Sequence, residues 1–217
     1  MISHEVLKKY QRENRHAFPE SLGLRVHRAL SWLKRAEAEK DDNDAAFIFL
    51  WIAFNAAYAN EFAQRRSFSE QRQFLEFIGK LLRLDSDKQL HSLVWQQYSG
   101  PIRILLSNHY VFEPFWSYQN GLIDENEWQA AFSSASQAAN RALAKADTKK
   151  LLAIVFSRLY VLRNQIMHGG ATWQGRVNRE QLRDAVKILR DTIPIVIHIM
   201  LHNPNQVWGE AAYPVVL

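Results

Sequence analysis

The stretch LLAIVFSRLYVLRNQIMHGG, residues 151–170, decides what kind of fold this chain can form. Residues 151–162 are apolar almost throughout, and the run is long enough for three helical turns. Gly169 and Gly170 then provide the stop signal that is typical of a helix C-terminus, and Thr148 is the predicted N-cap at the other end. We therefore predict a buried helix that ends in a polar cluster.

Apolar residues recur with helical spacing along most of the chain, and no long stretch alternates with the period of two that a strand requires. An all-α protein is predicted, with an almost entirely apolar helix at 47–58 that suits the centre of a bundle. Asp124 and Glu127 have the spacing of a capping box, and DDND at 41–44 supplies N-cap candidates. The predicted helices are 21–39, 47–58, 68–84, 86–98, 124–146, 148–168 and 178–202.

The stretch 100–121 shows the weakest helical pattern. Gly100-Pro101 is expected to end the helix before it, because proline excludes the helical conformation in the residue that precedes it. Residues 110–118 then include five aromatic residues, too many to leave exposed to water. We expect an irregular insertion that packs onto the bundle, with a partner-binding surface as the alternative.

Length and composition favour one domain over residues 1–217, with a core at about 20–203. Cysteine is absent from the sequence, which excludes disulfides, thiolate metal sites and cysteine nucleophiles. The net charge is +5, and residues 141–190 hold eleven Lys or Arg against three Asp or Glu. Such a segment favours RNA, DNA or a nucleotide as partner, although a basic face can also be a solvated helix surface.

No signal peptide or membrane span is predicted, because the longest apolar run, Ala45 to Phe54, has only ten residues. We expect a cytoplasmic protein without membrane contact. The motifs of serine hydrolases, P-loop NTPases and dinucleotide enzymes are absent from the sequence, so no cofactor is expected. His198 and His202 have the spacing of a metal-binding pair but lack a third partner in the sequence, so no metal site is expected either.

The polar cluster at the end of the 151–170 stretch consists of Arg163, Asn164 and His168. Asn164 and His168 share one helix face, while Arg163 lies 140° from His168 around an ideal helix. Imidazole can transfer protons near neutral pH, and guanidinium can hold a phosphate through two hydrogen bonds. The pair therefore suits phosphodiester chemistry without a metal. The alternative is structural: His168 interacts with the helix dipole, Arg163 pairs with a carboxylate, and Asn164 caps a turn.

The string LRNQIMHGG, residues 162–170, carries an R-x4-H motif with a polar residue directly after the arginine, and it resembles the HEPN superfamily. WIAFNAAY at 51–58 resembles the second-helix segment of many bacterial members. The tracts HGGATW at 168–173, NREQL at 178–182 and PNQVWGEAAYPVV at 204–216 resemble the C-terminal part of one bacterial subgroup. The resemblance covers about residues 20–203 at the level of fold.

This resemblance implies an antiparallel helical bundle that forms a homodimer, with two R-x4-H motifs facing each other across a cleft. Active members are metal-independent endoribonucleases. Arg163 would then bind the scissile phosphate, His168 would act as general acid or base, and Asn164 would orient the substrate or the catalytic pair. Attack by the ribose 2′-OH would leave a 2′,3′-cyclic phosphate and a 5′-OH. The family setting suggests a toxin, stress or phage-defence role, with an antitoxin or regulatory protein as a further partner.

One departure from the family concerns regulation. Some toxin members carry a tyrosine two positions after the histidine, where a partner enzyme modifies them, and this chain has Gly170 there. Other family members do not cut RNA and serve as nucleotide-binding or protein-interaction modules, so such a module is the alternative function. A purely structural helical scaffold is the third hypothesis.

Four further residues are predicted to contact substrate or to support the catalytic residues. Asn55 lies among aromatic residues on an apolar helix, where its amide needs a hydrogen-bond partner, and a purely structural contact is the alternative. Trp173 can stack on a base, or it can simply cover the core. Arg158 and Arg176 belong to the basic segment around the motif.

Overall fold

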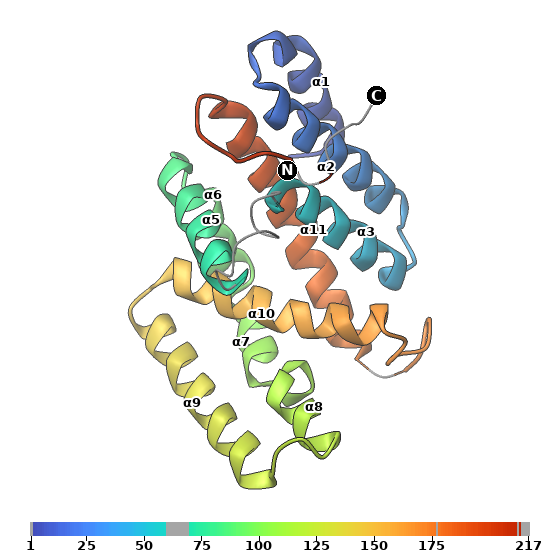
Figure 1. The fold of residues 1–217 in the computed structure, drawn as a ribbon, viewed down its shortest axis with the longest axis vertical. Coiled ribbons are helices and arrows are strands. Elements are labelled where there is room, and N and C mark those ends of the chain that lie inside the picture. Colours follow the sequence, from blue (N-terminus) through green and yellow to red (C-terminus); the bar gives the residue numbers. More distant parts are fainter. Residues whose placement is uncertain (1, 60–69, 177, 212, 214–217) are drawn as a thin grey trace. The chain divides into compact units, whose positions relative to one another are not determined.

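The computed structural model describes residues 2–59, 70–176, 178–211 and 213. In this part of the chain the regular elements are helices, with no β-strand, which confirms the all-α prediction (Figure 1). The chain divides into two compact units, one formed by Met1–Leu90 with Leu182–Leu217 and the other by His91–Gln181. The prediction of a single domain over 1–217 stays a prediction.

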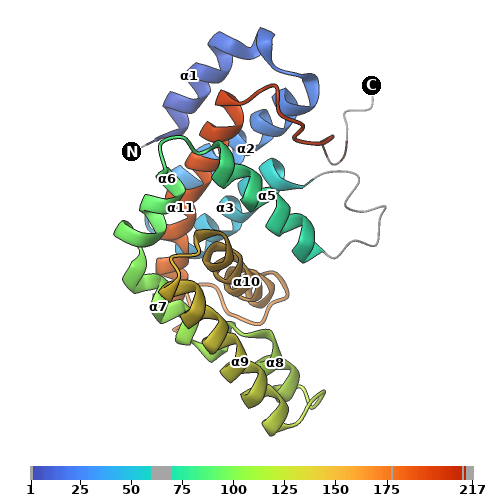
Figure 2. The same cartoon turned by 90° about the vertical axis from the view of Figure 1, so that its left-hand side faces the viewer.

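The first unit is built around a pair of helices that pack along each other, α2 and α3 (Figures 1 and 2). The helix predicted at 21–39 is confirmed as α2, and it packs against α1, a helix that was not predicted. Of the helix predicted at 68–84, residues 68 and 69 lie outside the described part. The helices of this unit are α1 (His4–Asn14), α2 (Glu20–Ala38), α3 (Asn43–Tyr58), α5 (Glu70–Leu84) and α11 (Arg179–His202), with a 3-10 turn at Arg15–Ala17.

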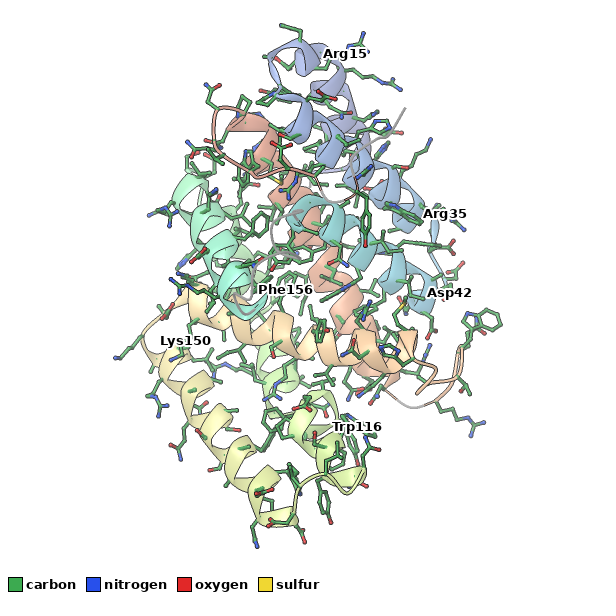
Figure 3. The ribbon with its side chains drawn as sticks, viewed as in Figure 1. Arg15, Arg35, Asp42, Trp116, Lys150 and Phe156 are labelled. Atoms are coloured by element: carbon green, nitrogen blue, oxygen red, sulfur yellow. The ribbon has the colours of Figure 1, made fainter. Side chains whose placement is uncertain are left out.

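The core of the first unit is apolar, as the patterns of α3 and α11 require. Phe47, Leu50 and Phe54 of α3 are buried. Asp42 is the N-cap of α3 and accepts a 2.9 Å hydrogen bond from the Ala45 N–H, so the DDND prediction is confirmed; Asp42 is labelled in Figure 3. The predicted apolar face of α11 is buried as well: Leu182, Ala185, Val186, Leu189, Ile193 and Val196.

The second unit is centred on the helix that carries the R-x4-H motif, α10. It packs against α7 and α9, and α8 packs against α9 (Figure 1). The boundary between the units falls within α6 (Gln89–Ser92) and near the start of α11. The other helices are α7 (Ser99–Ser107), α8 (Glu113–Gln119), α9 (Glu125–Ala144) and α10 (Thr148–Met167), with a π turn at Leu93–Gln97 and a 3-10 turn, η3, at His109–Val111.

Two predictions for residues 86–121 of this unit are wrong. The stretch 86–98 is not one helix, because α6 ends at Ser92 and a π turn follows. The stretch 100–121 is not irregular, because it forms α7, η3 and α8. A helical segment does end just before Gly100-Pro101, at Gln97, but Pro101 itself lies in the first turn of the next helix, α7, where the missing N–H would have no intrahelical partner.

The two long helices of the second unit begin with caps. Asp124 and Glu127 form the predicted capping box at the start of α9, with bonds of 2.9 and 3.2 Å between side chains and backbone N–H groups. The predicted cap Thr148 of α10 is wrong by one residue, because Asp147 accepts from the Lys150 N–H at 3.0 Å. The Thr148 hydroxyl instead bonds the Trp95 indole N–H and a nitrogen of the His91 ring.

Candidate functional site: the C-terminal end of α10

The end of α10 is fixed by its backbone hydrogen bonds. The His168 N–H donates to the Asn164 carbonyl at 3.0 Å, and the Gly169 N–H donates to the Ile166 carbonyl at 3.3 Å. The Gly170 N–H reaches back to the Gln165 carbonyl at 2.7 Å, and Gly169 has a φ of 72°. This is a Schellman ending, which needs glycine at the left-handed position. The predicted stop at Gly169-Gly170 is confirmed, and it holds His168 at a defined place.

Arg163 and Asn164 interact directly at this end of the helix. Arg163 Nη1 donates a 2.9 Å hydrogen bond to Asn164 Oδ1. The Arg163 guanidinium carbon also lies 6.0 Å from the ring centre of Tyr160, one turn earlier on α10. Its Nε is buried without a hydrogen-bond partner among the described residues. The guanidinium is thus oriented by two neighbours while part of its donor capacity is unused.

His168 is exposed, and its ring makes no hydrogen bond to any residue that the structure describes. Arg163 and His168 do not bond each other within the chain. The alternative in which Arg163 pairs with a carboxylate finds no support, since no such ion pair occurs within the described residues. The end of α10 therefore presents an oriented cation and an accessible imidazole five residues apart in the chain.

Two residues that the sequence analysis missed position this end of α10. The Gln165 amide donates to the Tyr110 carbonyl at 2.6 Å and accepts from Asn178 Nδ2 at 3.0 Å. Gln165 thus connects α10 to η3 and to the residue just before α11. Tyr160 is the second, and its spacing of three residues from Arg163 could have indicated it. The contacts of Gln165 are remote in sequence, and no local pattern could have shown them.

Exposed aromatic and basic side chains occur in the same part of the second unit. Trp173 follows α10 and is 70% exposed, so it does not simply cover the core. Tyr160 and Met167 are also exposed, one turn before and one turn after Arg163. Arg176 is exposed in the loop that leads to α11. Trp173 and Arg176 are therefore accessible, and their contacts with a ligand stay predictions.

Arg158 does not occupy the place expected of a residue that contacts substrate. Only 4% of it is exposed, and its guanidinium carbon lies 4.3 Å from the Phe112 ring centre and 5.7 Å from that of Phe132. Burial lowers the pKa of Arg158 to about 10. A desolvated cation–π contact contributes about 2 kcal/mol, whereas burial of an unpaired ion costs several. The sequence analysis assigned Arg158 to the basic segment because a single sequence does not show which arginines are buried.

Asn55 lies on α3 in the first unit and is half-buried. Its carbonyl accepts the Ala59 N–H at 2.7 Å, at the end of α3. Its side-chain amide has no hydrogen-bond partner within the described residues. The predicted support of Arg163 or His168 by Asn55 stays a prediction.

The histidine pair of α11 does not form a metal site in the described part of the chain. Within the described residues, no three His, Asp or Glu side chains are placed to hold a metal ion. The ring centres of His198 and His202 lie 4.0 Å apart on α11, and His202 stacks on Tyr10. In the same part of the chain, no helix has both the length and the apolar character needed to cross a bilayer.

Comparisons with protein-family models, with curated proteins and with solved structures gave no match to this chain. The site must therefore be interpreted from its own chemistry.

Proposed function

We propose that this chain is a HEPN-like, metal-independent endoribonuclease whose active site forms between two copies of the chain. The observation that carries the proposal is the end of α10, where Asn164 orients Arg163 and the Schellman ending presents an exposed His168. The sequence resemblance supports the same three residues.

Phosphodiester cleavage by the neighbouring 2′-OH needs a proton acceptor, a proton donor and a cation that stabilises the charge developing on phosphorus. Arg163 supplies the cation, and a guanidinium group can bind a phosphate oxygen through charge-assisted hydrogen bonds. His168 supplies one proton-transfer group with no hydrogen bond to break first. A second copy of the chain would bring the other histidine, so the proposed dimer completes the acid–base pair.

The test is cleavage of a labelled RNA pool in the presence of EDTA. Wild type is compared with His168→Ala and Arg163→Ala at matched oligomeric state. We expect cleavage by wild type and a loss of at least about a hundredfold in either variant, which is the size of effect that one proton-transfer group or one group stabilising the developing charge contributes. Equal cleavage by all three proteins would refute the assignment of these residues.

Matched control variants separate the site from general effects of charge and surface. His16→Ala removes an exposed histidine of the first unit, and Arg141→Ala removes an exposed arginine of α9. Both are expected to cut RNA at the wild-type rate. If Arg141→Ala lost as much activity as Arg163→Ala, the effect of Arg163 would reflect net charge rather than a specific phosphate contact.

One observation favours a second candidate function, a non-catalytic RNA- or nucleotide-binding module. Tyr160 is exposed beside Arg163, and a base can stack on its ring while Arg163 holds the phosphate, without any proton transfer. This module predicts that wild type binds RNA without cutting it. It also predicts that Arg163→Ala weakens binding while His168→Ala leaves it unchanged.

A further inference from the structure

Arg158 is a buried cation to which the proposed nuclease assigns no role. It is 96% buried on α10, and no acceptor among the described residues bonds its guanidinium. The two rings that cover it, Phe112 and Phe132, are themselves only half-buried.

A second buried arginine in the same chain shows how such a group is normally satisfied. Arg25 of the first unit is 1% exposed. Its guanidinium donates hydrogen bonds to four backbone carbonyls: Trp208 at 2.6 Å, Ala57 and Glu210 at 3.3 Å each, and Ala59. Buried polar groups are almost always bonded in this way. Arg158 is just as deep and lacks these acceptors, which points to an acceptor that binds from outside the chain.

Two further donors lie beside the Phe132 ring, which Arg158 also contacts. The centre of the His109 ring lies 6.4 Å from the centre of the Phe132 ring, and the centre of the Trp128 ring lies 6.3 Å from it. The Trp128 indole N–H is buried without a partner, and the His109 ring makes no hydrogen bond to the described residues. The Arg158 guanidinium, the Trp128 indole N–H and the His109 imidazole thus all lie beside one aromatic ring, and the Arg158 Nε and the Trp128 N–H are buried without a partner among the described residues.

We propose that Arg158, Trp128 and His109 bind the oxyanion of a small aromatic acid, a phosphate ester or a carboxylate. Guanidinium binds either oxyanion through two parallel hydrogen bonds. The indole N–H can donate to the same group, and so can the imidazole. The aromatic rings of η3, α8 and α9 provide an apolar surface for the planar part of the ligand, with Trp116 of α8 marked in Figure 3. This site does not include Arg163 or His168 and does not depend on RNA cleavage.

The test measures the thermal unfolding of the full chain with four probes at matched ionic strength. Phenyl phosphate and benzoate carry both a ring and an oxyanion, inorganic phosphate lacks the ring, and phenol lacks the oxyanion. We expect phenyl phosphate or benzoate to raise Tm by several degrees, inorganic phosphate to raise it less, and phenol to leave it unchanged. Whichever of the first two gives the larger shift identifies the oxyanion. No shift above the salt control with either aromatic acid would overturn the proposal.

Variants assign the shift to the site. Arg158→Met keeps the length of the side chain and should abolish the shift, while Trp128→Phe keeps the ring and should reduce it. Without ligand, Arg158→Met should be at least as stable as wild type, because it removes an unpaired buried charge. A shift that persists in Arg158→Met would overturn the site, and a large loss of stability in that variant would show that Arg158 is structural. If Arg158→Met does not fold, two other measurements test the site. Arg158→Lys should reduce the Tm shift, and phenyl phosphate should shift the Trp128 indole N–H resonance of wild type; absence of both effects would overturn the site.

Discussion

Arg163 and Asn164, adjacent in sequence, are joined by a 2.9 Å hydrogen bond from the guanidinium Nη1 to the side-chain Oδ1. Consecutive residues on an α-helix project about 100° apart around its axis. The two side chains must therefore bend towards each other to form this bond. Asn164→Ala should lower the RNA cleavage rate about tenfold, since a hydrogen bond to a charged group contributes roughly 1.5 kcal/mol. Single-turnover cleavage, with the protein in excess over the RNA and above the Kd, measures this effect. An unchanged rate in a folded Asn164→Ala protein would show that the bond does not position Arg163.

Gly169 should be required for the stability of the α10 ending. Its φ of 72° is a left-handed conformation that costs an L-residue with a Cβ about 1 kcal/mol. Gly169→Ala should therefore lower the free energy of unfolding by about 1 kcal/mol in urea titrations. Gly23→Ala is the matched control, because Gly23 lies inside α2 with open space at its Cβ. That control should raise stability by about 0.5 to 1 kcal/mol, so the two variants should differ in sign.

Several local features of the fold could be predicted from sequence because the responsible residues are adjacent in the chain. The capping box of Asp124 and Glu127 and the glycine stop after Met167 are of this kind. Thr148 shows the limit: it is a good cap residue by type, but its hydroxyl bonds Trp95 and His91, more than fifty positions away. Asp147 caps α10 instead.

The segment 100–121 and the candidate site show the same limit. Helices α7 and α8 have nine and seven residues, too short for a clear helical period in the sequence. Arg163, Asn164 and His168 could be selected because they lie within one short string. Burial of Arg158 and the bridge made by Gln165 depend on η3, α8 and α9, and no spacing within α10 reports those contacts.

His198 should make the stability of the protein depend on pH. Burial lowers its pKa, and His202 lowers it further, while Asp87 and Asp85 oppose the shift. Below pH 6.5 the unfolded chain takes up a proton that folded His198 resists, so the free energy of unfolding should fall as pH drops from 6.5 towards the lowered pKa. Burial also lowers the pKa of His4, which adds to this slope.

The measurement for His198 is a series of urea titrations between pH 7.5 and 5. His198→Gln should flatten the dependence of stability on pH, although His4 keeps part of it. His16→Gln, which alters an exposed histidine, should leave the slope unchanged. A slope as steep in His198→Gln as in wild type would contradict the assignment to His198.

Arg25 should be among the most important side chains for the stability of the first unit. Its removal leaves buried carbonyls at the end of α3 and near Trp208 without a donor. Arg25→Met should lower the free energy of unfolding by roughly 3 kcal/mol, because each buried unsatisfied group costs about 1 to 3 kcal/mol. Arg83→Met, at an exposed position of α5, should change it by less than about 0.5 kcal/mol. Equal effects of the two changes would contradict this role of Arg25.

The most direct test of the proposed nuclease is the chemistry of a single mapped cleavage position in EDTA. One RNA carries a ribose there, and its twin carries a 2′-deoxyribose. Wild type should cut only the ribose version, leaving a 2′,3′-cyclic phosphate and a 5′-OH, and His168→Ala should cut neither. Cleavage of the deoxy twin, or undiminished cleavage of the ribose version by His168→Ala, would contradict the proposal that Arg163 and His168 catalyse attack by the 2′-OH.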